Sequence, residues 1–129
     1  MSIKIDISVG ELLDKITILE IKAERIVDLK KLNNVNKELS VLNQQWKTSE
    51  YSNYDLTSDI AELKKINEQL WEIEDAIRDK EKDHSFDEVF IELARSVYFV
   101  NDKRAKIKHI INKKAGSELT EEKSYSEYS

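Results

Sequence analysis

The chain has 129 residues, a formal net charge of −5 and neither cysteine nor proline. The lack of cysteine excludes disulfides and thiolate metal sites, and the acidic balance argues against a general nucleic-acid-binding protein, which needs a basic surface. With 40% apolar residues, 36% charged residues and only two glycines, the composition favours one domain of long helices. Because the N-terminus lacks a signal-like pattern and no apolar run could span a bilayer, we expect a cytoplasmic protein that does not enter the membrane.

The N-terminal segment alternates isoleucine with charged residues over positions 3–7, the pattern of a short strand. No second segment of this kind follows, so it is expected to pair with another copy of the chain or to lie extended. Ser8 predicts a helix N-cap, because Glu11 stands three positions later as in a capping box. A first long helix is therefore expected over about 8–47.

The apolar face of this first helix changes along its length. Its two stripes are Leu12, Ile16, Leu19, Ala23 and Ile26, and then Leu32, Val35, Leu39, Leu42 and Trp46. At about 100° per residue, the second stripe lies more than a third of a turn round from the first. The change falls near Asn34, among asparagines of weak helix propensity. Either the helix kinks or breaks there, or one long rod packs against different neighbours.

Two further helices are predicted after a polar loop. One covers about 56–82, with Thr57, Ser58 or Asp59 as candidate caps. The other covers about 85–115. Its start is indicated by a capping box of Ser85 with Glu88, and its end by Gly116.

The predicted fold is therefore all-α, with three long antiparallel helices in a single domain over 1–116. Residues 117–129 form an acidic tail with Tyr125 and Tyr128, which is either flexible or docks through its tyrosines. Narrow apolar stripes on long helices and the strand-like start suggest self-association, and we expect a homodimer.

The last predicted helix carries an arginine inside its apolar seam. Arg104 lies between Val100 and Ile107, where a charge needs a partner. In a bundle it could join an interior polar cluster with the following residues: Glu20, Asn67, Glu74, Arg78 and Asn101. One interpretation is a set of structural ion pairs that fixes the helix register, with Arg104 paired to Glu20 or Glu74. The other is an interhelical pocket in which Arg104 binds an anionic small molecule.

Other polar patterns carry less information. Glu11 with Asp14 has the spacing of a magnesium-binding carboxylate pair, but such pairs arise by chance in a chain this acidic. The basic run over 103–114 is expected to stay solvated near the helix C-terminus. His84 and His109 have no second ligand at metal spacing, so no metal or cofactor is expected.

Three blocks of the sequence together resemble a known family. They are SVGELLDKITILEIKAERI at 8–26, INEQLWEIEDAIRDKE at 66–81, and FIELARSVYFVNDKRAKIKHIIN at 90–112 followed by GSELTEEKSY at 116–125. The family consists of small uncharacterised bacterial and phage proteins with a domain of unknown function, found near genes for surface polysaccharides. The resemblance implies a context and no catalytic residues. Two hypotheses follow: a self-associating helical interaction or accessory protein, or a small enzyme or sensor with an anion site at Arg104.

Overall fold

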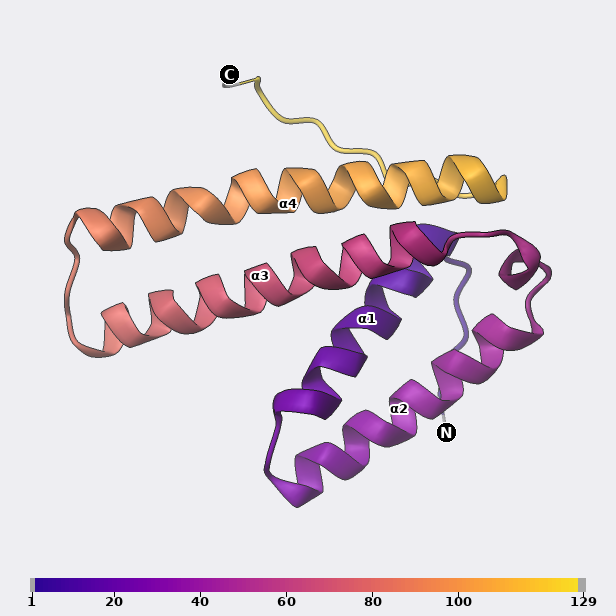
Figure 1. Cartoon of the computed structure of the whole chain (residues 1–129), viewed down its shortest axis with the longest axis horizontal. Coiled ribbons are helices and arrows are strands. Elements are labelled where there is room, and N and C mark those ends of the chain that lie inside the picture. The colour runs from indigo at the N-terminus through magenta and orange to yellow at the C-terminus, as the bar shows by residue number, and fades with distance from the viewer. Residues whose placement is uncertain (1, 128–129) are drawn as a thin grey trace.

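The computed structural model describes residues 2–127 and is all-helical, with no strand in that range (Figure 1). The elements in chain order are α1 (Val9–Arg25), α2 (Leu29–Thr48), the short 3-10 helix η1 (Glu50–Asn53), α3 (Thr57–Lys82) and α4 (Glu88–Ala115). No helix in the described part of the chain is long and apolar enough to cross a membrane. The all-α prediction is confirmed, but the prediction of three helices is wrong, because the first one is divided.

The division lies at residues 26–28 and not near Asn34. Ile26 has an extended backbone, with ψ at 131°, and ends α1. Asp28 then caps α2, because its carboxylate accepts a hydrogen bond from the Lys31 backbone N–H at 3.0 Å. Asn34 lies inside α2, where packing of α2 on α1 outweighs its weak helix propensity. The change of apolar face therefore reflects two antiparallel helices that face each other.

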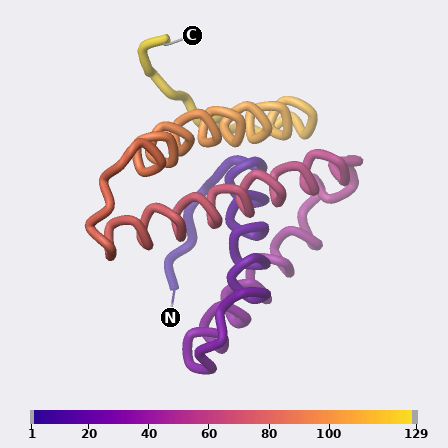
Figure 2. Tube along the Cα trace, turned by 60° about the vertical axis from the view of Figure 1, so that its left-hand side comes forward, coloured from indigo at the N-terminus to yellow at the C-terminus, as the bar shows by residue number. Residues whose placement is uncertain are grey.

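The core lies where α1 crosses the hairpin of α3 and α4 (Figures 1 and 2). Helix α1 packs against all three other α-helices, whereas α2 packs mainly on α1 and contributes no buried residue. The fully buried large side chains are Leu13, Thr17, Ile21, Leu56, Leu63 and Ile111. Helix α1 is thus the central element of the fold.

Helices α3 and α4 form the second antiparallel hairpin, close to the predicted ranges of 56–82 and 85–115 (Figure 1). The N-cap of α4 is Asp87 and not Ser85, because the Asp87 carboxylate accepts from the Phe90 backbone N–H at 3.0 Å. The same carboxylate binds Lys80 at 2.9 Å, which ties the cap to the end of α3. Gly116 ends α4 with a left-handed φ of 65°, as predicted.

The distal half of this second hairpin projects past α1 (Figure 1). Buried residues end at Leu70 in α3 and begin at Val100 in α4, so residues 71–99 bury no side chain. We call residues 71–99 the distal arm. It is a two-helix structure that α1 contacts at its base, where Arg25 pairs with Glu72 at 2.7 Å.

The terminal segments carry no regular structure in the described range. Residues 2–8 form no strand, and Ile3 and Ile5 are exposed. The tail over 117–127 follows α4, and the Ser117 hydroxyl accepts a hydrogen bond from the Val9 backbone N–H at 3.2 Å. Tyr128, named in the predicted tail, lies outside the described residues.

Candidate functional site

Helices α1 and α4 lie in close contact at Gly10. A Cβ atom on Gly10 would lie 2.6 Å from the Lys108 carbonyl oxygen, so no larger residue fits without a shift. The Gly10 backbone N–H donates to the Asn112 side-chain oxygen at 2.7 Å, which pins the crossing. This close contact buries the polar side chains that flank it.

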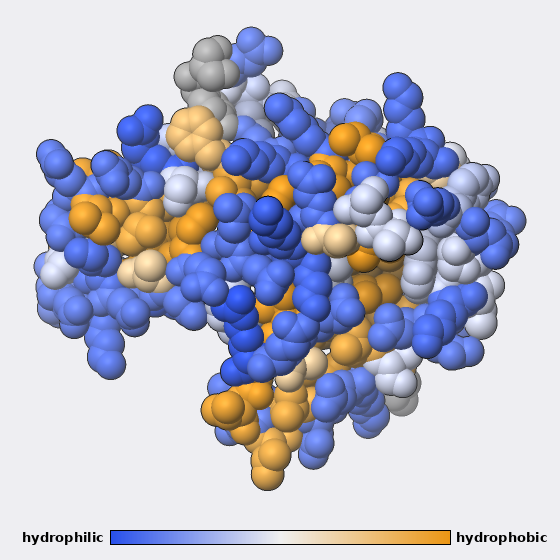
Figure 3. Space-filling view, in the orientation of Figure 1, coloured by the Kyte–Doolittle hydropathy of each residue, from blue (hydrophilic) through white to orange (hydrophobic). Residues whose placement is uncertain are grey.

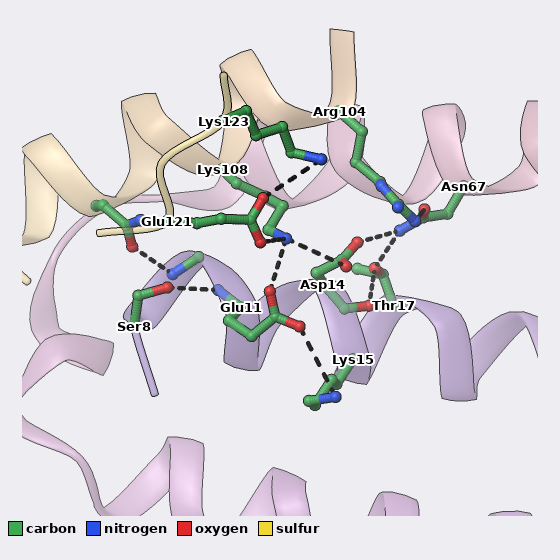
Figure 4. A network of polar contacts seen from close by, with 12 residues as sticks. Ser8, Glu11, Asp14, Lys15, Thr17, Asn67, Arg104, Lys108, Glu121 and Lys123 are labelled. Carbon is green, nitrogen blue, oxygen red and sulfur yellow. Dashed lines mark hydrogen bonds and ion pairs between the residues drawn. The ribbon is translucent and has the colours of Figure 1, made fainter. Parts of the chain in front are cut away.

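Two of these side chains are charged, Lys108 and Asp14, and each is 7% exposed. The Lys108 ammonium contacts the carboxylates of Glu11 at 2.6 Å, Glu121 at 3.1 Å and Asp14 at 3.7 Å (Figure 4). Burial disfavours the charged form, but these carboxylates outweigh it and raise the pKa of Lys108 above its ordinary value. The lysine therefore stays protonated and joins α1, α4 and the tail.

A chain of hydrogen bonds leads from this cluster to Arg104. The Asn67 amide nitrogen donates to the Asp14 carboxylate at 2.9 Å and to the Thr17 hydroxyl at 3.0 Å. The Arg104 guanidinium in turn donates to the Asn67 side-chain oxygen at 3.4 Å (Figure 4). Because Asp14 also contacts Lys108, one polar network runs along the face where α1, α3 and α4 meet.

Arg104 faces an open groove of about 430 Å³ between α3 and α4. The lining residues are Ile18, Asn67, Leu70, Trp71, Glu74, Asp75, Arg78, Asn101 and Arg104. Five of the six predicted site residues therefore line one groove. Glu20 is the exception. The hydrogen bond between Lys64 of α3 and Glu24 raises the pKa of Lys64, and the charge of Glu20 adds to this effect.

The expected ion pair of Arg104 with Glu20 or Glu74 does not form. Over residues 2–127, no carboxylate lies within 4.0 Å of the Arg104 guanidinium. Glu74 instead lies 3.8 Å from Arg78, one turn along α3, and both side chains are at least half exposed. A guanidinium with one amide contact keeps most of its donors available to a ligand.

Lys108 and Asn112 were not among the predicted site residues. The basic run that contains Lys108 was expected to be solvated, yet Lys108 is buried because it shares the inward face of α4 with Ile107 and Ile111. Its position four residues after Arg104 was the available signal, since residues four apart share a helix face. Glu11 and Asp14 do converge, but on this lysine. Across residues 2–127, no group of three or more acidic or histidine side chains is arranged to hold a metal ion.

Residues 3–128 match the sequence profile of a family described as "Family of unknown function (DUF6165)". The chain belongs to this family. No curated protein and no solved structure matches this DUF6165 protein.

Proposed function

We propose that this protein is a helical interaction protein that self-associates as a homodimer through the distal arm. The observation that supports this is an apolar seam without a cover. Its half-buried members are Ile77, Phe90, Leu93 and Val97. Two antiparallel helices cannot bury such a seam on both sides, whereas a second copy related by a two-fold axis would complete a four-helix arrangement.

The surface of the distal arm supports the same proposal. Phe86, Val89 and Ile91 are each more than half exposed. Apolar surface gathers over this end of the molecule, with a smaller apolar tip on the α1–α2 hairpin (Figure 3). Contiguous exposed apolar surface is characteristic of interaction sites, and the arm is the larger candidate.

Sedimentation equilibrium tests the dimer directly. We expect twice the monomer mass of 15.1 kDa at micromolar concentration. Val89→Glu should shift the equilibrium to monomer, because it places a charge in the interface. Val41→Glu is the matched control, since Val41 on α2 is 52% exposed against 51% for Val89, and should leave the dimer intact. A monomeric wild-type protein, or equal weakening by both variants, contradicts the proposal.

A second candidate function is favoured by the groove at Arg104. We propose that it binds a small anionic molecule, as expected of a small enzyme or sensor. Arg104 would hold the anionic group, while Asn101 offers a hydrogen bond and Trp71 an apolar wall. The acidic side chains of Glu74 and Asp75 suit a ligand that also carries hydroxyl groups. The resemblance to proteins encoded near surface-polysaccharide genes favours a sugar phosphate as the ligand. The cytoplasmic location of the protein stays a prediction.

Trp71 supplies the experiment for this second function. The chain has two tryptophans, so Trp46→Phe leaves Trp71 as the sole tryptophan and as a reporter in the groove. We expect a saturable fluorescence change with one member of a panel of sugar phosphates and nucleoside monophosphates. Arg104→Gln should abolish the change. Arg95→Gln, an exposed position on the same helix, should retain it. Absence of any response in the parent, or equal responses in both variants, rules the groove out.

A further inference from the structure

A second cavity, of about 370 Å³, lies between α4 and the tail. Its lining includes Lys106, Lys108, Ile110 and Asn112 from α4, and Glu121 and Lys123 from the tail. It shares no lining residue with the Arg104 groove. We call it the tail cavity.

An unused hydrogen-bond donor lies at this cavity. Asn112 is 97% buried, and its side-chain oxygen accepts from the Gly10 backbone N–H. Its side-chain nitrogen, however, has no hydrogen-bond partner in the described part of the chain. A buried amide N–H without an acceptor is rare in folded proteins and calls for an explanation. A bound acceptor would provide one.

The charges around the tail cavity favour an anionic acceptor. Lys106 and Lys108 of α4 line the cavity, and the carboxylate in its lining, Glu121, belongs to the tail. That carboxylate contacts Lys108 at 3.1 Å and Lys123 at 3.6 Å. Figure 4 shows Glu121 reaching from the tail to Lys108, while Glu11 and Asp14 approach the same ammonium from α1. Among the described partners of Lys108, Glu121 belongs to the tail and not to a helix, so it can leave together with the tail.

We propose that the tail cavity binds a phosphate group, and that Glu121 occupies the place of this phosphate on Lys108 when the ligand is absent. A carboxylate ligand would only repeat the contacts of Glu121. A phosphate has more acceptor oxygens, so it can accept from Lys108 and also from Asn112, which shares the same helix face one turn later. Binding of the phosphate group displaces Glu121 and frees the tail.

The test uses the full chain and inorganic phosphate, with sodium chloride keeping the ionic strength constant. The readouts are the midpoint of thermal unfolding and the initial rate of trypsin cleavage after Lys123. In the wild type, millimolar phosphate should raise both the midpoint and the cleavage rate. Glu121→Gln removes the internal competitor, so the midpoint should respond at several-fold lower phosphate concentration. Glu122→Gln, an exposed neighbour, is the matched control and should behave as the wild type.

Two more variants make the result decisive. Asn112→Asp keeps the oxygen that Gly10 requires but replaces the donor by a negative oxygen, so the phosphate response should disappear. Arg104→Gln should keep the response, because Arg104 does not line the tail cavity. The proposal is overturned if phosphate changes neither readout in the wild type and Glu121→Gln. It is equally overturned if Glu121→Gln and Glu122→Gln respond alike, or if Arg104→Gln removes the response and so places the phosphate in the groove.

Discussion

Lys108 and Arg104 lie one turn apart on α4, and their surroundings differ sharply. Lys108 is buried and contacts three carboxylates, from α1 and from the tail. Arg104 is partly buried, contacts the side chain of Asn67 and faces an open groove. Both cations occupy the inward side of the same helix. Whether such a charge is structural therefore depends on the carboxylates that neighbouring elements bring to it, and not on its place in the seam.

Removal of the Lys108 ammonium should have the largest effect. Lys108→Ala removes the ammonium that Glu11 and the buried Asp14 share, and the loss of one partner of a buried ion pair costs about 3–5 kcal/mol of folding free energy. Denaturant unfolding measures this loss. Lys113→Ala, at an exposed position of α4, is the control and should change the stability by no more than about 0.5 kcal/mol. Similar values for the two variants would show that the cluster does not hold α1 on α4.

The crossing itself is tested at Gly10. Gly10→Ala places a methyl group 2.6 Å from the Lys108 carbonyl oxygen, and that oxygen belongs to a helix backbone that cannot easily move. Such overpacking costs about 1–3 kcal/mol. Gly116→Ala meets no atom within 4 Å and is strained only by its left-handed φ. Calorimetric unfolding should therefore rank Gly10→Ala as the more damaging of the two. The reverse order would mean that α1 and α4 can separate at little expense.

The helix ends and the two polar sites show how much of the structure the sequence alone predicts. Local signals located most helix ends, because the Ser8 cap and the Gly116 end depend only on nearby residues. The reversal at residues 26–28 was missed because Asp28 caps α2 without the glutamate three positions later that completes a capping box. The groove residues were predicted together because helical periodicity places them on facing sides of α3 and α4. The Lys108 cluster was not predicted, because its carboxylates come from α1 and from the irregular tail. Helical periodicity carries no information on how these segments pack on α4.

Acid should weaken the contact between the tail and Lys108. Burial opposes ionisation of Glu121, but the hydrogen bond from Lys108 prevails and holds the pKa of Glu121 below its ordinary value of 4.5. A group with a depressed folded-state pKa stabilises fully above its unfolded pKa and loses this contribution as pH falls through the folded value. The stability difference between wild type and Glu121→Gln should therefore be constant above about pH 4.5 and be lost progressively as pH falls through the lower folded-state pKa. A difference that persists at pH 2 would show that Glu121 does not act through its charge.

Lys108 should lose its contribution to stability at high pH, and not at low pH. Its pKa is raised above 10.5, so its contribution is complete below that pH and is lost only as pH rises through the folded value. The cluster around Lys108 is thus intact across the neutral range. The unfolding midpoint, measured at increasing alkaline pH, tests this, and Lys113→Ala is again the control. An early loss near neutral pH would mean that the lysine is not held by its carboxylates.

Arg104→Ala should have the smallest effect on stability. Its contact with Asn67 is 3.4 Å long, at the weak end of hydrogen-bond geometry, and no carboxylate in the described chain is left behind when the guanidinium is removed. We expect a loss of no more than about 1 kcal/mol in denaturant unfolding, close to that of Arg95→Ala. A loss as large as that of Lys108→Ala would reveal a structural partner for Arg104. Arg104 would then not be available to hold a ligand in the groove. A small loss of stability would instead show that folding does not require the charge at this position.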